Sequence, residues 1–216
     1  MARIDDYKKA AELARRELSS IIPRRIAELA GAVFHEENET EPITVEFLGK
    51  RLILTWPDMS FLYEETREEV PIQEQVLILH YMEGAARNGG AGLTGEWMAF
   101  QDVPDGRFYL DAFQRRAKIP LVKTFGGNPE RMAELAEKTY EARRLDLGDV
   151  SVSIKALPRI SVALVLWAGD EEFPPEGNVL FDKNTGLYLP AEDLAWLSGM
   201  IVYPLMGLAA ASFGKH

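Results

Sequence analysis

The chain has no cysteine among its 216 residues. It therefore forms no disulfide, offers no thiolate nucleophile and supplies no side-chain ligand for an iron–sulfur cluster. Histidine is scarce as well, because the chain has three, His35, His80 and His216, which are far apart in the sequence. Metal sites built on cysteine or histidine need several such ligands together, so we expect no site of that kind and assign no residue to a metal.

Positive charge is in deficit. The 24 lysines and arginines are outnumbered by 34 aspartates and glutamates, and the formal net charge is −10 at pH 7. Residues 33–75 carry much of this excess, with 11 acidic and 3 basic side chains. Proteins that bind nucleic acid concentrate lysine and arginine in a patch or stripe, so we expect no nucleic-acid partner.

The N-terminal residues do not have the basic start and apolar stretch of a secretory signal peptide, so the sequence does not predict secretion. One long uncharged stretch, residues 194–214, has the length that could cross a bilayer. Gly199, Pro204 and Gly207 in this stretch are typical of close packing within protein. Membrane-spanning helices are usually flanked by several basic residues, whereas this stretch is followed by Lys215 alone. We therefore expect a kinked core helix, no membrane partner and a cytoplasmic location.

Apolar periodicity predicts both helices and strands. Residues 43–56 alternate around a glycine turn and predict a hairpin, and residues 150–156 alternate before a strand at 160–167. Short strands are expected at 179–181 and 187–189, on either side of a turn. Helical spacing or start signals predict helices near residues 3–20, 23–31, 71–82, 107–116, 129–140 and 190–214.

Early and late hairpins with helices between and after them predict an α+β fold. We expect an antiparallel sheet built from two or more hairpins, packed with several helices that include the buried C-terminal helix. The length and the 47% hydrophobic content fit a single α+β domain over residues 1–216. Residues 1–32 would be its helical N-terminal annex.

A glycine-rich stretch matches the pattern GxGxxG at Gly90, Gly92 and Gly95. A dinucleotide site needs a strand before this pattern and a helix after it, because the helix N-terminus holds the pyrophosphate. Here a helix precedes and an extended piece, residues 96–100, follows. We therefore predict a loop at the rim of a pocket and no dinucleotide binding.

The candidate site lies where the strand at 160–167 ends. Three carboxylates follow that strand directly, and Pro174 and Pro175 stiffen the chain beyond them. Aromatic walls with a few convergent polar groups are the general pattern of ligand pockets. The candidate ligand-binding residues are Trp97, Phe100, Trp167, Asp170, Glu172, Phe173 and Asp182.

Three functions are compatible with this arrangement. The first is a non-catalytic accessory domain that binds a small molecule or cofactor, whose identity the sequence does not give. The alternative is a hydrolase or lyase using paired carboxylates from Asp170, Glu171, Glu172 and Asp182, with or without a divalent cation. The third is a protein-interaction adaptor, for which the acidic residues 33–75 would provide the surface.

Several segments resemble one family in their order and spacing. They are residues 75–82 (QVLILHYM), 95–100 (GEWMAF), 109–117 (YLDAFQRRA), 167–174 (WAGDEEFP), 180–182 (LFD) and 189–194 (LPAEDL). With them the chain resembles the family of domain of unknown function 3786, found mainly in anaerobic bacteria and archaea. The resemblance implies an anaerobe and no established activity. Some relatives carry cysteine-rich iron–sulfur segments, an association that a chain without cysteine does not share.

Overall fold

The computed structural model describes residues 4–213, with side chains through residue 211; Lys215 and His216 lie outside the described residues. The chain forms two compact units. Unit 1 comprises the chain up to Gly92 together with Leu157–Arg159 and Leu187–Leu189. Unit 2 comprises Leu93–Ala156, Ile160–Gly186 and the chain from Pro190 onward. The expectation of a single domain stays a prediction.

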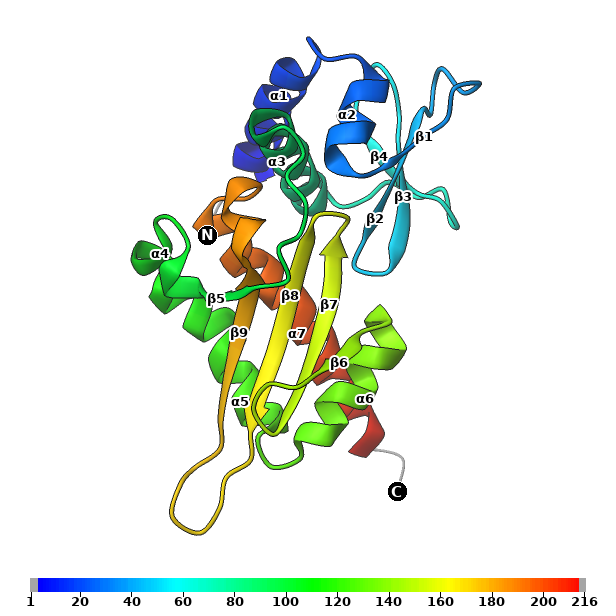
Figure 1. Cartoon of the computed structure of the whole chain (residues 1–216). Helices are drawn as coiled ribbons and strands as arrows, with labels where there is room; N and C mark the ends of the chain where they lie inside the picture. Colours follow the sequence, from blue (N-terminus) through cyan, green and yellow to red (C-terminus); the bar gives the residue numbers. More distant parts are fainter. Residues whose placement is uncertain (1–3, 214–216) are drawn as a thin grey trace. The chain divides into compact units, whose positions relative to one another are not determined.

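Unit 1 combines an antiparallel sheet with three helices (Figure 1). The strand order is β1-β2-β3-β4, and helices α1 and α2 both pack on α3. The strands are β1 (Val33–Phe34), β2 (Ile43–Phe47), β3 (Lys50–Leu54) and β4 (Phe61–Tyr63). The helices are α1 (Ile4–Leu18), α2 (Pro23–Ala30) and α3 (Ile72–Asn88).

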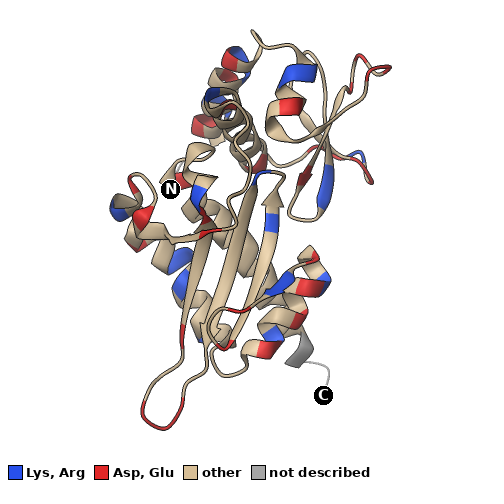
Figure 2. Cartoon of the chain, viewed as in Figure 1, with Lys and Arg blue, Asp and Glu red and all other residues tan. Residues whose placement is uncertain are grey.

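Local signals set these elements as predicted. Pro23 begins α2, and Gly31, at a φ of 65°, closes it by donating its N–H to the last carbonyls. The β2–β3 hairpin turns at Leu48 and Gly49, whose φ values of 48° and 76° suit a tight hairpin turn. In Figure 2 the acidic residues of the segment 33–75 lie mainly on the loops of this unit.

Two short segments from later in the chain complete unit 1 around Tyr81 on α3. The Tyr81 hydroxyl donates to the Ala30 carbonyl at 2.5 Å and accepts from the backbone N–H of Arg159 at 3.1 Å. The ring of Tyr188 stacks on Tyr81 with 5.3 Å between centroids. Burial raises the pKa of Tyr81 far above its ordinary value. Tyr81 thus joins three separate parts of the chain.

Unit 2 is built on a five-stranded antiparallel sheet in the order β5-β9-β8-β7-β6. Its strands are β5 (Trp97–Ala99), β6 (Arg143–Leu145), β7 (Val150–Leu157), β8 (Ile160–Trp167) and β9 (Glu176–Asp182). Its α-helices are α4 (Gly106–Phe113), α5 (Ile119–Phe125), α6 (Pro129–Tyr140) and α7 (Ala191–Phe213). A π-helical turn, η2 (Gln114–Lys118), joins α4 to α5, and short 3-10 helices are η1 (Phe100–Asp102) and η3 (Lys183–Leu187).

Strand β8 forms at the predicted residues 160–167 and is the middle strand of this sheet. It pairs with β7 on one side and β9 on the other, and its residues from Val162 to Leu166 are fully buried. The predicted α6 start is also confirmed, since the Asn128 side chain accepts the N–H of Arg131 and Pro129 is the first helical residue. The α+β fold with antiparallel sheets is therefore as expected.

Helix α7 is buried along one side. Leu194, Leu197, Ile201 and Leu205 are inaccessible, whereas Tyr203 is 51% exposed. By length and composition alone, the stretch Ala191–Ala211 could cross a membrane, and half of its apolar window is buried within the protein. The predicted core packing is confirmed for the buried side, and the absence of a membrane partner stays a prediction.

The strand expected at residues 187–189 does not form. The chain makes the 3-10 helix η3 after β9, and Leu187–Leu189 then joins unit 1. The physical reason is the stacking of Tyr188 on Tyr81, which outweighs the extended preference of three apolar residues. Strand β9 itself is longer than expected, because it begins at Glu176 and not at residue 179.

Candidate functional site

The seven candidate residues from the sequence fall into two groups at opposite ends of β9. Trp97 pairs with Asp182 at one end, and Trp167 pairs with Glu176 at the other. The six residue steps between these ends amount to about 20 Å of extended strand. The structure therefore does not bring the seven side chains into one pocket. The sequence predicts a strand of only three residues here, and with so short a strand the residues at its two ends would lie close together.

Asp182 is saturated by its own chain. It is 2% exposed, and its Oδ2 accepts the N–H groups of Thr94 and Gly95, each at 2.8 Å, and the Thr94 hydroxyl at 3.0 Å. Its Oδ1 accepts the N–H of Asn184 at 3.0 Å, which forms an Asx-type turn. A carboxylate engaged in this way anchors the end of the glycine-rich loop and has little capacity left for a ligand.

Phe100 is a core residue and not a pocket wall. It is 1% exposed, stacks on Phe113 with 4.2 Å between centroids, and lies 6.0 Å from the ring of Phe181. Such aromatic clusters stabilise a core beyond the area that they bury. Trp97 is partly exposed on the edge strand β5. At this end of β9, Asp182 therefore anchors a loop and Phe100 packs in the core, and neither lines a pocket.

The other group lies on the hairpin tip, the loop of residues 168–175 between β8 and β9. Asp170 Oδ1 accepts the N–H groups of Phe173 and Glu172, each at 2.8 Å, and these bonds lower the pKa of Asp170. The loop is therefore held in a defined shape. Together with Gly126 and Gly127 it surrounds a shallow hollow of about 420 Å³. Its carboxylates are exposed, and neither Asp182 nor Trp97 lines the hollow.

These placements bear on the carboxylate-based alternative. Asp170, Glu171 and Glu172 lie at one end of β9 and Asp182 at the other, so the expected pairing across the site does not occur. Among residues 4–213, no three histidine, aspartate or glutamate side chains come together where they could hold a metal ion. Nothing in the described side chains therefore favours metal-assisted hydrolysis over simple binding.

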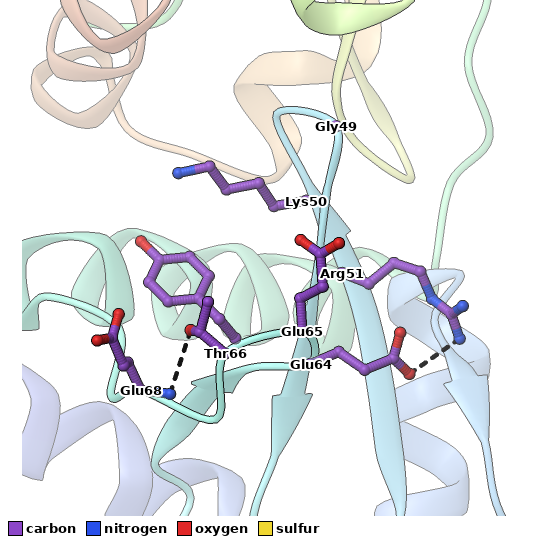
Figure 3. Close-up of a pocket in the computed structure, with 8 residues that line it drawn as sticks. Gly49, Lys50, Arg51, Glu64, Glu65, Thr66 and Glu68 are labelled. Carbon is purple, nitrogen blue, oxygen red and sulfur yellow. Dashed lines mark hydrogen bonds and ion pairs between the residues drawn. The ribbon is translucent and has the colours of Figure 1, made fainter.

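Unit 1 has a hollow with mixed charge, about 570 Å³ in volume, between the β2–β3 hairpin and the chain after β4 (Figure 3). Arg51 forms an ion pair with Glu64 at 3.0 Å, and the Lys50 ammonium lies 4.9 Å from the ring centroid of Tyr63. Burial, and then Glu74, to which its hydroxyl donates at 3.2 Å, raises the pKa of Tyr63 to about 12. Both cations of this hollow are thus already engaged within the chain.

A second hollow in unit 1, of about 520 Å³, is lined mainly by rings. We call it the aromatic hollow. Its apolar lining residues are Pro23, Phe34, Pro42, Trp56 and Pro57. Its polar lining residues are His35, Glu36, Asn38, Glu39 and Thr40. Phe34 and Trp56 are partly exposed, so their rings are accessible from solvent.

Backbone hydrogen bonds fix the walls of the aromatic hollow. The N–H of His35 donates to the Pro42 carbonyl at 2.8 Å, and the N–H of Trp56 donates to the Thr40 carbonyl at 2.7 Å. His35 Nε2 lies 2.9 Å from the hydroxyl of Thr44, a buried residue of β2, which holds the imidazole in place. The loop of residues 35–42 is therefore tied to the sheet at both ends.

Sequence reasoning missed this hollow because β1 has only two residues and gives no periodic signal. The strand register brings its residues together: Phe34 pairs with Ile43, and Ile43 pairs with Leu54, two residues before Trp56. The available signal was Trp56, the last residue of the predicted hairpin and directly before Pro57, with Phe34 upstream of the hairpin.

These observations define a class: an α+β protein with two antiparallel sheets and a solvent-open aromatic hollow beside the smaller sheet. The chain belongs to the family of domain of unknown function 3786 (DUF3786), whose model matches residues 23–203. The matched region contains both the aromatic hollow and the hairpin tip, and the resemblance noted from the sequence is confirmed. Neither the curated proteins nor the solved structures contain a match to the chain.

Proposed function

We propose that the protein is a non-catalytic accessory domain of the cytoplasm that binds a small organic molecule or cofactor in the aromatic hollow. The observation that carries the proposal is the lining: two accessible aromatic rings and three prolines around about 520 Å³. Ligand pockets are concave, mostly apolar and about 300–1,000 Å³ in size, with a few placed polar groups.

The lining favours a flat, largely apolar ligand with a polar edge. Trp56 offers a ring face for stacking, and Phe34 offers the face opposite the Arg24 guanidinium, which lies 5.2 Å from its ring centroid. His35 and Asn38 add hydrogen-bonding groups to the lining. The backbone bonds of His35 and Trp56 hold the walls before any ligand arrives, which lowers the entropy lost on binding. In the mixed-charge hollow a ligand would have to displace the ion pair of Arg51 with Glu64 and the contact of Lys50 with the Tyr63 ring. In the aromatic hollow Glu36 pairs with Arg24, but among the described residues Trp56 carries no such contact with a cation.

Ligand binding is tested by a thermal-shift screen with tetrapyrroles, nucleotides and aromatic heterocycles, followed by titration of any hit. A ligand that binds only the folded state at about 100 times its Kd stabilises it by about 2.7 kcal/mol. We expect Trp56→Leu to remove the response while the variant remains folded, because the stacking face is lost.

Trp167→Leu is the matched control, since Trp167 is also partly exposed but lies on the hairpin of unit 2. It should leave the response unchanged. A response that survives Trp56→Leu and disappears in Trp167→Leu would contradict the proposal and return the site to the hairpin.

A second candidate function is interaction with another protein, in line with the adaptor reading of the sequence. It is favoured by the hairpin tip, where Phe173 is 67% and Trp167 is 42% exposed next to three exposed carboxylates. Large exposed apolar side chains that cluster on one segment are typical of interaction surfaces.

A further inference from the structure

A surface of unit 2 combines apolar and cationic side chains on the helix formed by η2 and α5. We call it the cationic strip, made of Arg115, Lys118, Ile119 and Lys123. Ile119 is 53% exposed, and Arg115 and Lys123 are exposed beside it. Among the described residues, none of the three cations forms an ion pair with a carboxylate. The strip contains a π-helical turn, a feature found often at functional sites.

The hairpin tip has the complementary character. It carries Asp170, Glu171 and Glu172 followed by Phe173, which is 67% exposed. The two hydrogen bonds to Asp170 Oδ1 fix the loop, so the aromatic ring and the carboxylates are presented in one conformation. A preformed surface loses less entropy when it docks than a mobile loop would.

The strip and the tip are neighbours in unit 2. Helix α5 ends next to the tip, because a Cβ built on Gly126 would lie 2.8 Å from ring atoms of Pro175. Figure 2 shows basic residues along this helix and acidic residues on the loop beyond its end. We take the strip and the tip together as one surface, with positive charge along the helix and negative charge on the loop beyond its end.

We propose that this surface joins two copies of the chain, with the hairpin tip of each copy docked on the cationic strip of the other. A two-fold interface requires a self-complementary patch, in which each part meets a different part of the same patch. Opposite charges at the two ends satisfy that requirement, with Phe173 of one copy against Ile119 of its partner. The same patch explains why cations are left unpaired in a chain of net charge −10.

The full-length chain is tested by sedimentation analysis over a concentration series, at about 0.01 M and about 1 M salt. Charge screening shortens from about 30 Å to about 3 Å between these salts, so the dimer should weaken at high salt. Two charge-reversed variants should each raise the dimer Kd by roughly tenfold or more. They are Arg115→Glu with Lys123→Glu in the strip, and Glu171→Lys with Glu172→Lys in the tip.

The chain that carries all four reversals restores opposite charges across the interface and should recover the dimer. This recovery separates pairing across the interface from damage to folding, which circular dichroism checks in every variant. Phe173→Ser should weaken the dimer, whereas Phe108→Ser should not, because Phe108 is 85% exposed on α4 outside the strip. A monomer at all concentrations in low salt, or a folded four-fold variant that stays monomeric, would overturn the proposal.

Discussion

Two aspartates of unit 2, Asp182 and Asp170, differ in what they do for the fold. Asp182 and Asp170 are both aspartates at the end of a strand or just beyond it, and both were candidates for ligand binding. Asp182 is buried and accepts four hydrogen bonds, whereas Asp170 is exposed and accepts two. Sequence reasoning found both residues, but it could not tell their roles apart, since burial depends on chain segments more than 80 residues away.

The difference predicts different responses to the same substitution. In the carboxylate of Asp182 one oxygen accepts three hydrogen bonds and the other accepts one. Asp182→Asn replaces one of these oxygens with an NH₂ group, so at least one buried hydrogen bond is lost and two donors face each other. We expect a loss of about 1–3 kcal/mol in the free energy of unfolding, measured by urea denaturation.

Asp170→Asn is the control, because an exposed amide oxygen can still accept both backbone N–H groups of the tip. Its effect should remain within about 0.5 kcal/mol. Equal losses for the two variants would show that the bonds to Asp182 add no stability of their own.

The elements follow the sequence wherever a local signal is strong. Pro23 with Gly31, Asn128 with Pro129, and the alternation before β8 each determine an element boundary within the chain segment itself. Strand β1, the first half of β9 and the segment Leu187–Leu189 have no such signal. Their structure is set by pairing or stacking with distant residues, which is why the aromatic hollow was not predicted and the seven candidates were placed together.

Strand β8 is the element on which unit 2 depends most. Leu164 is inaccessible at its centre, with neighbouring strands on both sides. Leu164→Asp would bury an unpaired carboxylate, at a cost of several kcal/mol, and we expect no soluble folded protein on expression. Val33 is 57% exposed on the edge strand β1, so Val33→Asp should express as the parent does. A soluble Leu164→Asp protein with the parent's melting temperature would contradict the interior position.

At the scale of the whole molecule, neither compact unit is a continuous piece of chain. Unit 1 includes Leu157–Arg159 and Leu187–Leu189, each flanked by residues of unit 2. The Tyr81 hydroxyl accepts from Arg159 and its ring stacks on Tyr188, so these contacts depend on both segments. The matched family region, residues 23–203, likewise spans both units.

A fragment that ends at Gly92 should therefore not fold as unit 1 does in the whole protein. It would leave the Tyr81 hydroxyl short of one partner and the Tyr81 ring without its stacking neighbour, in a small domain of marginal stability. Amide spectra of the fragment should lack the dispersion of a folded domain. A fragment with native-like dispersion would show that unit 1 is an independent domain.

The late arrival of those two segments also has a consequence for synthesis on the ribosome. Tyr188 follows Tyr81 by 107 residues. At about 5–20 residues per second, the first tyrosine leaves the ribosome roughly 5–20 seconds before the second. During that interval α3 is synthesised, but the Tyr81 ring lacks its stacking neighbour and, until Arg159 follows, its hydroxyl lacks one of its two partners. The N-terminal part of the nascent chain must therefore wait, exposed to chaperones and proteases, until the last quarter of the chain is made.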